Sequence, residues 1–113
     1  MDERRLSELM TALADPNRRS ALALLAGGEE LCVCELMAAL DVSQSRMSRH
    51  MAALKAAGLV SDRRDAQWVR YRIERQGSVE VERIVEAVLA GVKFPIVRTC
   101  THPQQSRQKE LVS

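Results

Sequence analysis

The spacing of the apolar residues changes twice along this chain of 113 residues, and this change constrains its fold most strongly. Over residues 1–58 apolar side chains recur every three or four positions, as in Met47, Met51 and Leu54, which is the spacing of one face of a helix. Over residues 59–73 the period falls to two, as in a strand. Helical spacing then returns. The pattern predicts four helices, a β-hairpin and a final helix.

Residues that are favoured at helix ends mark where the helices begin and end. Asp15 can cap a second helix that starts at Pro16. Ser43 can cap the fourth helix, which follows a short third helix and ends at Gly58. The hairpin should turn at "RDAQ". Because this turn has no glycine, we expect Asp65 to take the unusual backbone conformation.

A chain of this length supports one domain with a modest core. Aromatic residues make up only 3% of it, so the core must consist of Leu, Val, Ala and Met, which favours helices. We expect the domain to span residues 1–94, with a fifth helix ending near Phe94, and a polar tail at 95–113. We expect no signal peptide, and because the chain has no apolar run of roughly 18 residues and an odd number of cysteines, we expect a soluble protein of the reducing cytoplasm.

Positive charge is concentrated in the middle of the chain, although the whole chain carries only +2. Residues 41–75 hold eight basic and four acidic side chains, whereas residues 1–40 hold four basic and seven acidic ones. Such a local excess is typical of a face that binds a polyanion, although an ordinary solvated surface can also carry it.

Only "DVS" separates the third helix from the fourth, and this is the turn length of a helix-turn-helix motif. With the hairpin behind it, the predicted fold is mainly α with a small β-hairpin, a winged helix-turn-helix in the order ααααββα. The fourth helix would be the recognition helix and the hairpin the wing.

The polar face of the fourth helix carries side chains suited to reading DNA. Gln can pair with adenine, Arg with guanine, and Ser can serve a base or a phosphate. Without the basic hairpin, a solvated amphipathic helix would explain these residues equally well. The hairpin arginines would supply mainly non-specific affinity, and we place Trp68 at the base of the wing. The predicted DNA contacts are Ser43, Gln44, Ser45, Arg46, Ser48, Arg49 and His50 from the helix, and Arg63, Arg64 and Arg70 from the hairpin.

One recognition helix with one wing rarely suffices for operator-level affinity, so we expect a homodimer that reads a two-fold symmetric site in double-stranded DNA. The apolar stripes of the first and fifth helices are wider than a small core needs, and they are the candidate interface. The alternative is that both stripes only close the core of the monomer.

Over roughly residues 5–90 the sequence resembles the ArsR/SmtB family of metalloregulatory repressors. The resemblance is carried by "LADPNRRSALALL", "ELCVCEL", "DVSQSRMSRHMAALKAAGLV" and "DRRDAQWVRYRI". The cysteine pair in "ELCVCEL" is similar to that of the arsenic- and antimony-responsive branch. The resemblance implies a homodimeric repressor of an arsenic-resistance operon, without a permanent cofactor, that leaves its operator when trivalent arsenic or antimony binds cysteine thiolates.

Cys32 and Cys34 stand at the expected first turn of the third helix. Trivalent arsenic is thiophilic, so two nearby thiolates suit it. On a regular helix residues i and i+2 point about 200° apart, so both can hold one small ion only if this turn distorts. Ligand binding should then disturb the helix against which the recognition helix packs.

The arsenic-responsive branch commonly has a third cysteine where this chain has Met37. Cys100, beyond the fifth helix, could supply a third sulfur from the same or the other subunit, or could be an idle residue of the tail. Three other interpretations of the pair stay open: buried structural cysteines, a thiol redox sensor, and a cadmium- or lead-responsive site on the same fold.

An enzyme with Cys34 as nucleophile is the alternative from a different class. Only His50 and His102 could serve as its base, one on the recognition helix and the other in the tail. The chain shows no Ser/His/Asp arrangement and no phosphate-binding loop, so we expect no enzymatic activity.

Overall fold

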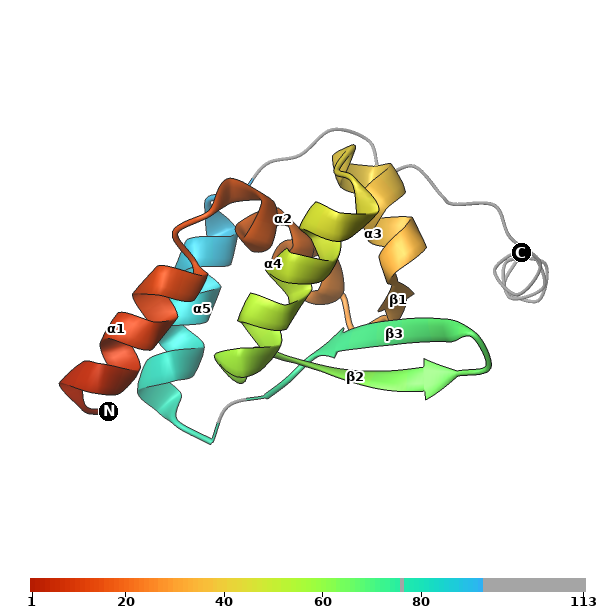
Figure 1. The fold of residues 1–113 in the computed structure, drawn as a ribbon. Helices are drawn as coiled ribbons and strands as arrows, with labels where there is room; N and C mark the ends of the chain where they lie inside the picture. Colours follow the sequence, from red (N-terminus) through yellow and green to blue (C-terminus); the bar gives the residue numbers. More distant parts are fainter. Residues whose placement is uncertain (76, 93–113) are drawn as a thin grey trace.

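A computed structural model describes residues 1–75 and 77–92 of the chain (Figure 1). The elements, in order, are α1 (Glu3–Ala12), α2 (Pro16–Leu25), β1 (Leu31–Cys32), α3 (Val33–Leu40), α4 (Gln44–Ala56), β2 (Val60–Asp65), β3 (Trp68–Ile73) and α5 (Val79–Ala90). The winged helix-turn-helix order is confirmed, with one additional strand, β1, between α2 and α3. No helix within these residues is long and apolar enough to cross a membrane.

The polar residues expected at the helix starts do cap them. The Asp15 carboxylate accepts hydrogen bonds from the backbone N–H groups of Asn17, at 2.7 Å, and Arg18, at 3.2 Å. Ser43 Oγ accepts from the backbone N–H of Arg46 at 3.3 Å and so fixes the start of α4. Each cap satisfies N–H groups that have no partner inside the helix.

The fifth helix also starts where expected, because Ser78 caps it, but it ends at Ala90 with Gly91 as the C-cap. This is earlier than the end predicted near Phe94. Phe94 itself, and the predicted boundary between the domain and the tail at residues 94 and 95, lie outside the described residues.

The third strand of the sheet was not predicted. The strand order is β1-β3-β2, and both pairings are antiparallel. Leu31 lies opposite Tyr71, and Cys32 lies opposite Arg70. A strand of two residues is too short to show an alternating pattern in the sequence. Its pairing joins the segment that carries the cysteines directly to the wing formed by β2 and β3.

The turn of the wing differs from the prediction at two residues. Ala66, with φ of 58°, takes the left-handed conformation that was expected of Asp65. Asp65 instead ends β2 opposite Trp68, so Trp68 lies at the tip of the wing and not at its base. The Asp65 carboxylate accepts a hydrogen bond from Arg70, and this contact holds Asp65 in the strand.

The core consists of aliphatic and methionine side chains, as the composition predicts. Leu36 of α3 is fully buried, and so are Met47, Met51 and Leu54 of α4, the stripe seen in the sequence. These side chains pack α4 against α3, so the position of α3 sets the position of α4. Figure 1 shows the wing extending away from the helices, beyond one end of α4.

Candidate DNA-binding surface and thiol site

The face of α4 that points away from the core is polar and exposed. Its exposed side chains are those of Gln44, Ser45, Arg46, Ser48 and Arg49, and the capping residue Ser43 is exposed as well. Ser45 and Arg49 are four residues apart and lie on the surface opposite Met47, and the exposed Gln44 and Ser48 flank that surface on one side. The surface has the hydrogen-bonding groups that contact base edges and phosphates.

His50 was predicted on this surface, but the structure places it inside the molecule. The residue is 9% exposed, with Nδ1 3.4 Å from Nη1 of Arg18 and Nε2 3.8 Å from Oδ1 of Asp15. The reason is the helical period, because position 50 follows Met47 by three residues and precedes Leu54 by four. His50 therefore packs α4 onto the start of α2 and does not face DNA in this conformation.

Asp15 links this contact to the cap of α2. Burial opposes the ionised carboxylate, but the backbone N–H groups of Arg18 and Asn17, with the nearby charges of His50 and Arg18, outweigh it and lower the pKa of Asp15. The Arg18 guanidinium also donates to the backbone carbonyl groups of Ala12, at 2.6 Å, and Thr11, at 3.0 Å. These contacts hold α1, α2 and α4 together behind the exposed face of α4.

The three arginines predicted to contact DNA from the wing lie in different environments. Arg64 of β2 is exposed, and among the described residues it makes no ion pair. Arg63 is exposed too, but its guanidinium is paired with Glu30. Arg70 is 2% exposed, and its Nε donates to Oδ2 of Asp65 at 2.9 Å. Of the three, Arg64 is the cation most available to phosphate.

Arg70 is thus a correction to the predicted DNA surface. It stands on β3, the central strand of the sheet, between Cys32 of β1 and Arg63 of β2, and neighbours on both sides cover it. An alternating pattern identifies which residues share a face, but it does not tell a central strand from an edge. Arg70 braces the wing through Asp65 and is not on the surface in this conformation.

Cys32 lies at the junction of β1 and α3. It is the N-cap of α3, with extended backbone (φ −84°, ψ 164°), and its side chain is fully buried. Its backbone N–H donates to Oε1 of Glu35 at 3.0 Å. Its sulfur faces the backbone N–H groups of Glu35 and Cys34. This is the geometry of a capping box in which a thiol, a weak acceptor, replaces a hydroxyl.

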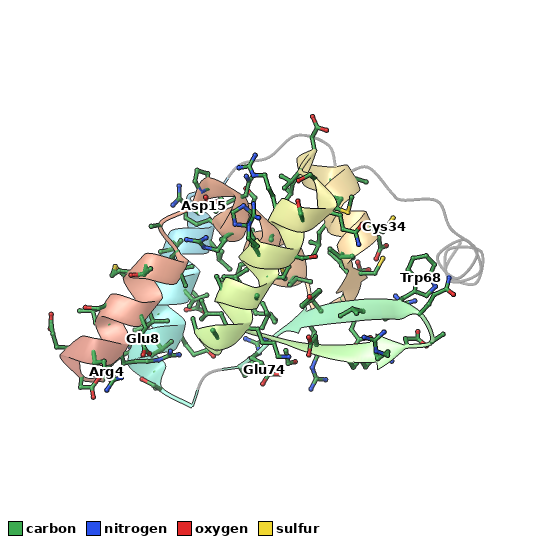
Figure 2. All side chains as sticks on the ribbon, viewed as in Figure 1. Arg4, Glu8, Asp15, Cys34, Trp68 and Glu74 are labelled. Atoms are coloured by element: carbon green, nitrogen blue, oxygen red, sulfur yellow. The ribbon has the colours of Figure 1, made fainter. Side chains whose placement is uncertain are left out.

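The helical part of the prediction for the cysteine pair is therefore wrong. Cys32 precedes α3 and only Cys34 lies within it, so the angle of about 200° for two helical residues does not describe them. Cys34 is half-buried near the start of α3 (Figure 2). Cys100 lies outside the described residues.

The Cys32 thiol is held in its protonated form by its surroundings. Burial raises the pKa of Cys32, and the charge of the Glu35 carboxylate raises it further, while the two backbone N–H groups oppose the shift. The first turn of α3 therefore holds a buried thiol whose conversion to a thiolate is unfavourable until a ligand replaces the proton. Within the described residues, no group of three His, Cys, Asp or Glu side chains could hold a metal ion.

Two acidic residues near the thiols make contacts that were not predicted. Glu35 closes the cap of α3, and its position three residues after Cys32 is the capping-box spacing, which the sequence does contain. Glu30 holds Arg63 through a contact between segments 33 residues apart, and nothing local in the sequence indicates it.

Comparison with known proteins agrees with this geometry. "Arsenic resistance transcriptional regulator ArsR1" from Pseudomonas putida is 49% identical over 80 residues, which are 71% of this chain and 59%, less than two thirds, of that protein. "Arsenic resistance transcriptional regulator ArsR2" from the same organism is 42% identical over 82 residues, 73% of this chain and 71% of that protein. The structure of HlyU from Vibrio cholerae is similar with a TM-score of 0.65 at 36% identity, covering 78% of this chain and 94% of that one.

The helix-turn-helix of α3 and α4, together with the projecting wing, defines the fold class of winged-helix transcriptional regulators. A family model described as "Bacterial regulatory protein, arsR family" matches residues 15–62, from the cap of α2 into β2. The chain belongs to the arsR family of bacterial regulatory proteins.

Proposed function

We propose that this chain represses arsenic-resistance genes and leaves its operator when trivalent arsenic, or antimony, binds Cys32 and Cys34. The observation that carries the proposal is the place of Cys32, which caps α3 and at the same time pairs with the wing strand β3. The names of the two Pseudomonas relatives support arsenic resistance as the process. Cytoplasmic location is part of the proposal, because operator DNA is there.

In the proposed complex, the exposed face of α4 reads the bases and the wing contacts phosphates. The residues assigned to the bases and adjacent phosphates are Ser43, Gln44, Ser45, Arg46, Ser48 and Arg49. Arg64 is the wing contact, because it is exposed and within the described residues makes no ion pair. His50 and Arg70 are left out because both are buried.

A homodimer is also part of the proposal. Met10 of α1 is 45% exposed and Val79 of α5 is 65% exposed, and the terminal amino group before α1 contacts Glu80 of α5 at 3.3 Å. Figure 1 shows α1 and α5 side by side, at the end of the molecule opposite the tip of the wing. Pairing through this surface would leave α4 and the wing of each subunit available for a two-fold symmetric site.

The ligand would act by withdrawing the cap of α3. Arsenous acid, As(OH)3, reacts with two thiols to form two As–S bonds and two water molecules. In this proposal the Cys32 sulfur leaves the N–H groups of the first turn when it binds arsenic together with Cys34. Loss of that cap shifts α3, and because α3 packs on α4, the recognition helix moves with it.

Fluorescence anisotropy with a labelled duplex from upstream of the gene tests the proposal. The reduced protein should bind this duplex more tightly than a random one, and arsenite or antimonite should release it at concentrations at which zinc has no effect. Release by cadmium or lead but not arsenite would favour a divalent-metal repressor. Release by peroxide alone would favour thiol redox control instead.

The pH dependence of ligand binding separates arsenite from divalent metals. Arsenous acid exchanges hydroxide for thiol with no net release of protons, so its equilibrium affinity should be unchanged from pH 6 to 8. Because the pKa of Cys32 is raised, its thiol stays protonated over this range and its thiolate fraction grows with pH. The rate of arsenite binding should therefore rise by up to about tenfold per pH unit.

Cadmium should behave differently, because Cd²⁺ must displace one proton from each thiol. Its affinity for the two cysteines should rise by up to about 100-fold per pH unit below the thiol pKa values. Stopped-flow and equilibrium titrations with each ligand at pH 6, 7 and 8 measure both effects. If the affinity for arsenite rises with pH as steeply as the affinity for cadmium, arsenite does not bind by exchanging its hydroxides for protonated thiols.

Cys100 is proposed as an auxiliary third ligand. Inorganic arsenite has three exchangeable hydroxides, whereas a methylated trivalent arsenic has only two. We therefore expect Cys100→Ser to weaken the response to arsenite modestly and to leave the response to methylated arsenic nearly unchanged. The effect should be modest because ordering the tail costs about 1–2 kcal/mol per fixed residue, which offsets much of the gain from a third As–S bond. X-ray absorption on the arsenite complex counts the sulfurs. Three sulfurs in both wild type and Cys100→Ser would rule Cys100 out.

A further inference from the structure

Arg63 and Glu30 form the most complete ion pair among the described residues. Nη2 of Arg63 donates to Oε1 of Glu30 at 2.7 Å, and Nε of Arg63 lies 3.0 Å from Oε1 and 2.9 Å from Oε2. This two-pronged contact occupies the side of the guanidinium that would also bind a phosphate. The Arg63 side chain is nevertheless 54% exposed, so the pair lies at the surface of the wing.

The two partners belong to opposite edges of the sheet. Arg63 is on β2, while Glu30 directly precedes β1, and the central strand β3 separates the two edges. Glu30 is held close to this position because the next two residues, Leu31 and Cys32, pair with β3. A carboxylate fixed in this way can hold the Arg63 side chain across the sheet whenever no other anion is present.

We propose that Glu30 competes with DNA phosphate for the guanidinium of Arg63 and thereby limits the affinity of the wing for DNA. This inference rests on the proposed DNA binding by the wing. A carboxylate and a phosphate bind the same kind of N–H fork, so a phosphate must displace Glu30 to reach the Nε–Nη2 side of Arg63, and the charge of Glu30 opposes its approach. Arg64, next in sequence and without an ion pair among the described residues, has no such competitor.

The test uses a random-sequence duplex, because phosphate contacts do not depend on the operator. Glu30→Gln keeps the shape of the side chain and removes its charge, so it frees Arg63. Each phosphate contact adds about 0.9 to the slope of log affinity against log salt. Glu30→Gln should bind the duplex more tightly than wild type at 50 mM salt, and its affinity should fall more steeply with salt, by about 0.9 in this slope per wing. The ratio of its affinity to that of wild type should therefore be roughly 3.5-fold smaller per wing at 200 mM salt.

Glu29→Gln is the matched control. Glu29 is adjacent, exposed and, within the described part of the chain, without an ion pair, so this variant removes the same charge without freeing an arginine. It should change the affinity less than Glu30→Gln and leave the slope as in wild type. Arg63→Gln should barely change the slope in the wild-type protein but should abolish the gain in Glu30→Gln. Arg64→Gln should flatten the slope in both backgrounds.

Two results would overturn the inference. One is that Glu30→Gln and Glu29→Gln behave alike, and the other is that Arg63→Gln alone flattens the slope as much as Arg64→Gln, which would mean that Arg63 already contacts phosphate. Arsenite titrations of wild type and Glu30→Gln keep the proposals separate. If arsenite releases neither protein from DNA while the salt dependence of the two proteins differs as expected, the proposal of arsenic sensing fails. The proposed competition between Glu30 and phosphate then still holds.

Discussion

Cys32→Ser should keep its affinity for operator DNA and lose its response to arsenite. Serine is a better N-cap than cysteine, so the start of α3 and its hydrogen bond to Glu35 should survive the change. A hydroxyl is a poor ligand for a thiophilic ion. Loss of outer partners of a metal site typically costs roughly 10–100-fold, so loss of a direct ligand should raise the arsenite concentration for half release by more than about 100-fold.

Cys32→Ala is the control that separates the cap from the ligand. It removes the thiol as serine does but leaves the first turn of α3 without a capping acceptor, at a cost of about 1 kcal/mol in the free energy of unfolding. Anisotropy titrations with arsenite and urea unfolding of both variants give the comparison. Cys34→Ser should likewise keep its affinity for operator DNA and should not be released by arsenite. Loss of operator binding by Cys32→Ser would instead show that the cysteine is structural.

Arg49→Ala and Gln44→Ala should each lower operator affinity far more than affinity for random DNA. Both side chains are on the exposed face of α4, where a paired hydrogen bond to a base contributes about 1–3 kcal/mol of discrimination. This corresponds to a loss of roughly 5–150-fold in the ratio of operator to random affinity. Dissociation constants for the two duplexes, measured at one salt concentration, give that ratio directly.

Arg64→Ala is the comparison for these variants. A wing arginine that contacts only phosphate should weaken binding to operator and random DNA by the same factor, leaving the ratio unchanged. If Arg64→Ala lowers the ratio as much as Arg49→Ala does, the wing reads sequence as well. If Arg49→Ala leaves the ratio unchanged, α4 does not read the operator through this residue.

Much of the fold was predictable because its signals are local. Asp15, Ser43 and Ser78 each begin a helix through contacts within three residues, and the apolar stripe of α4 appears in any window that contains it. The exposed face of α4 follows from the same period. Local signals therefore sufficed to predict the helices and the polar side chains that α4 presents.

What could not be predicted depends on residues distant in the sequence. The pairing of β1 with β3 and the contact of Glu30 with Arg63 join segments more than 30 residues apart. The burial of Arg70 follows from the central place of its strand, which only the strand order determines. The burial of His50 could have been predicted, because its spacing from Met47 already places it on the core side of α4.

Because β1 is only two residues long, little free energy is needed to open the sheet at this edge. Protein segments open locally with free energies that range from almost zero to that of global unfolding, and two paired residues at the edge of a sheet belong to the lower end of this range. The junction around Cys32 can therefore open while the core beneath α4 stays closed. Under the proposed function, the change of state would then break only a few hydrogen bonds and would need no refolding.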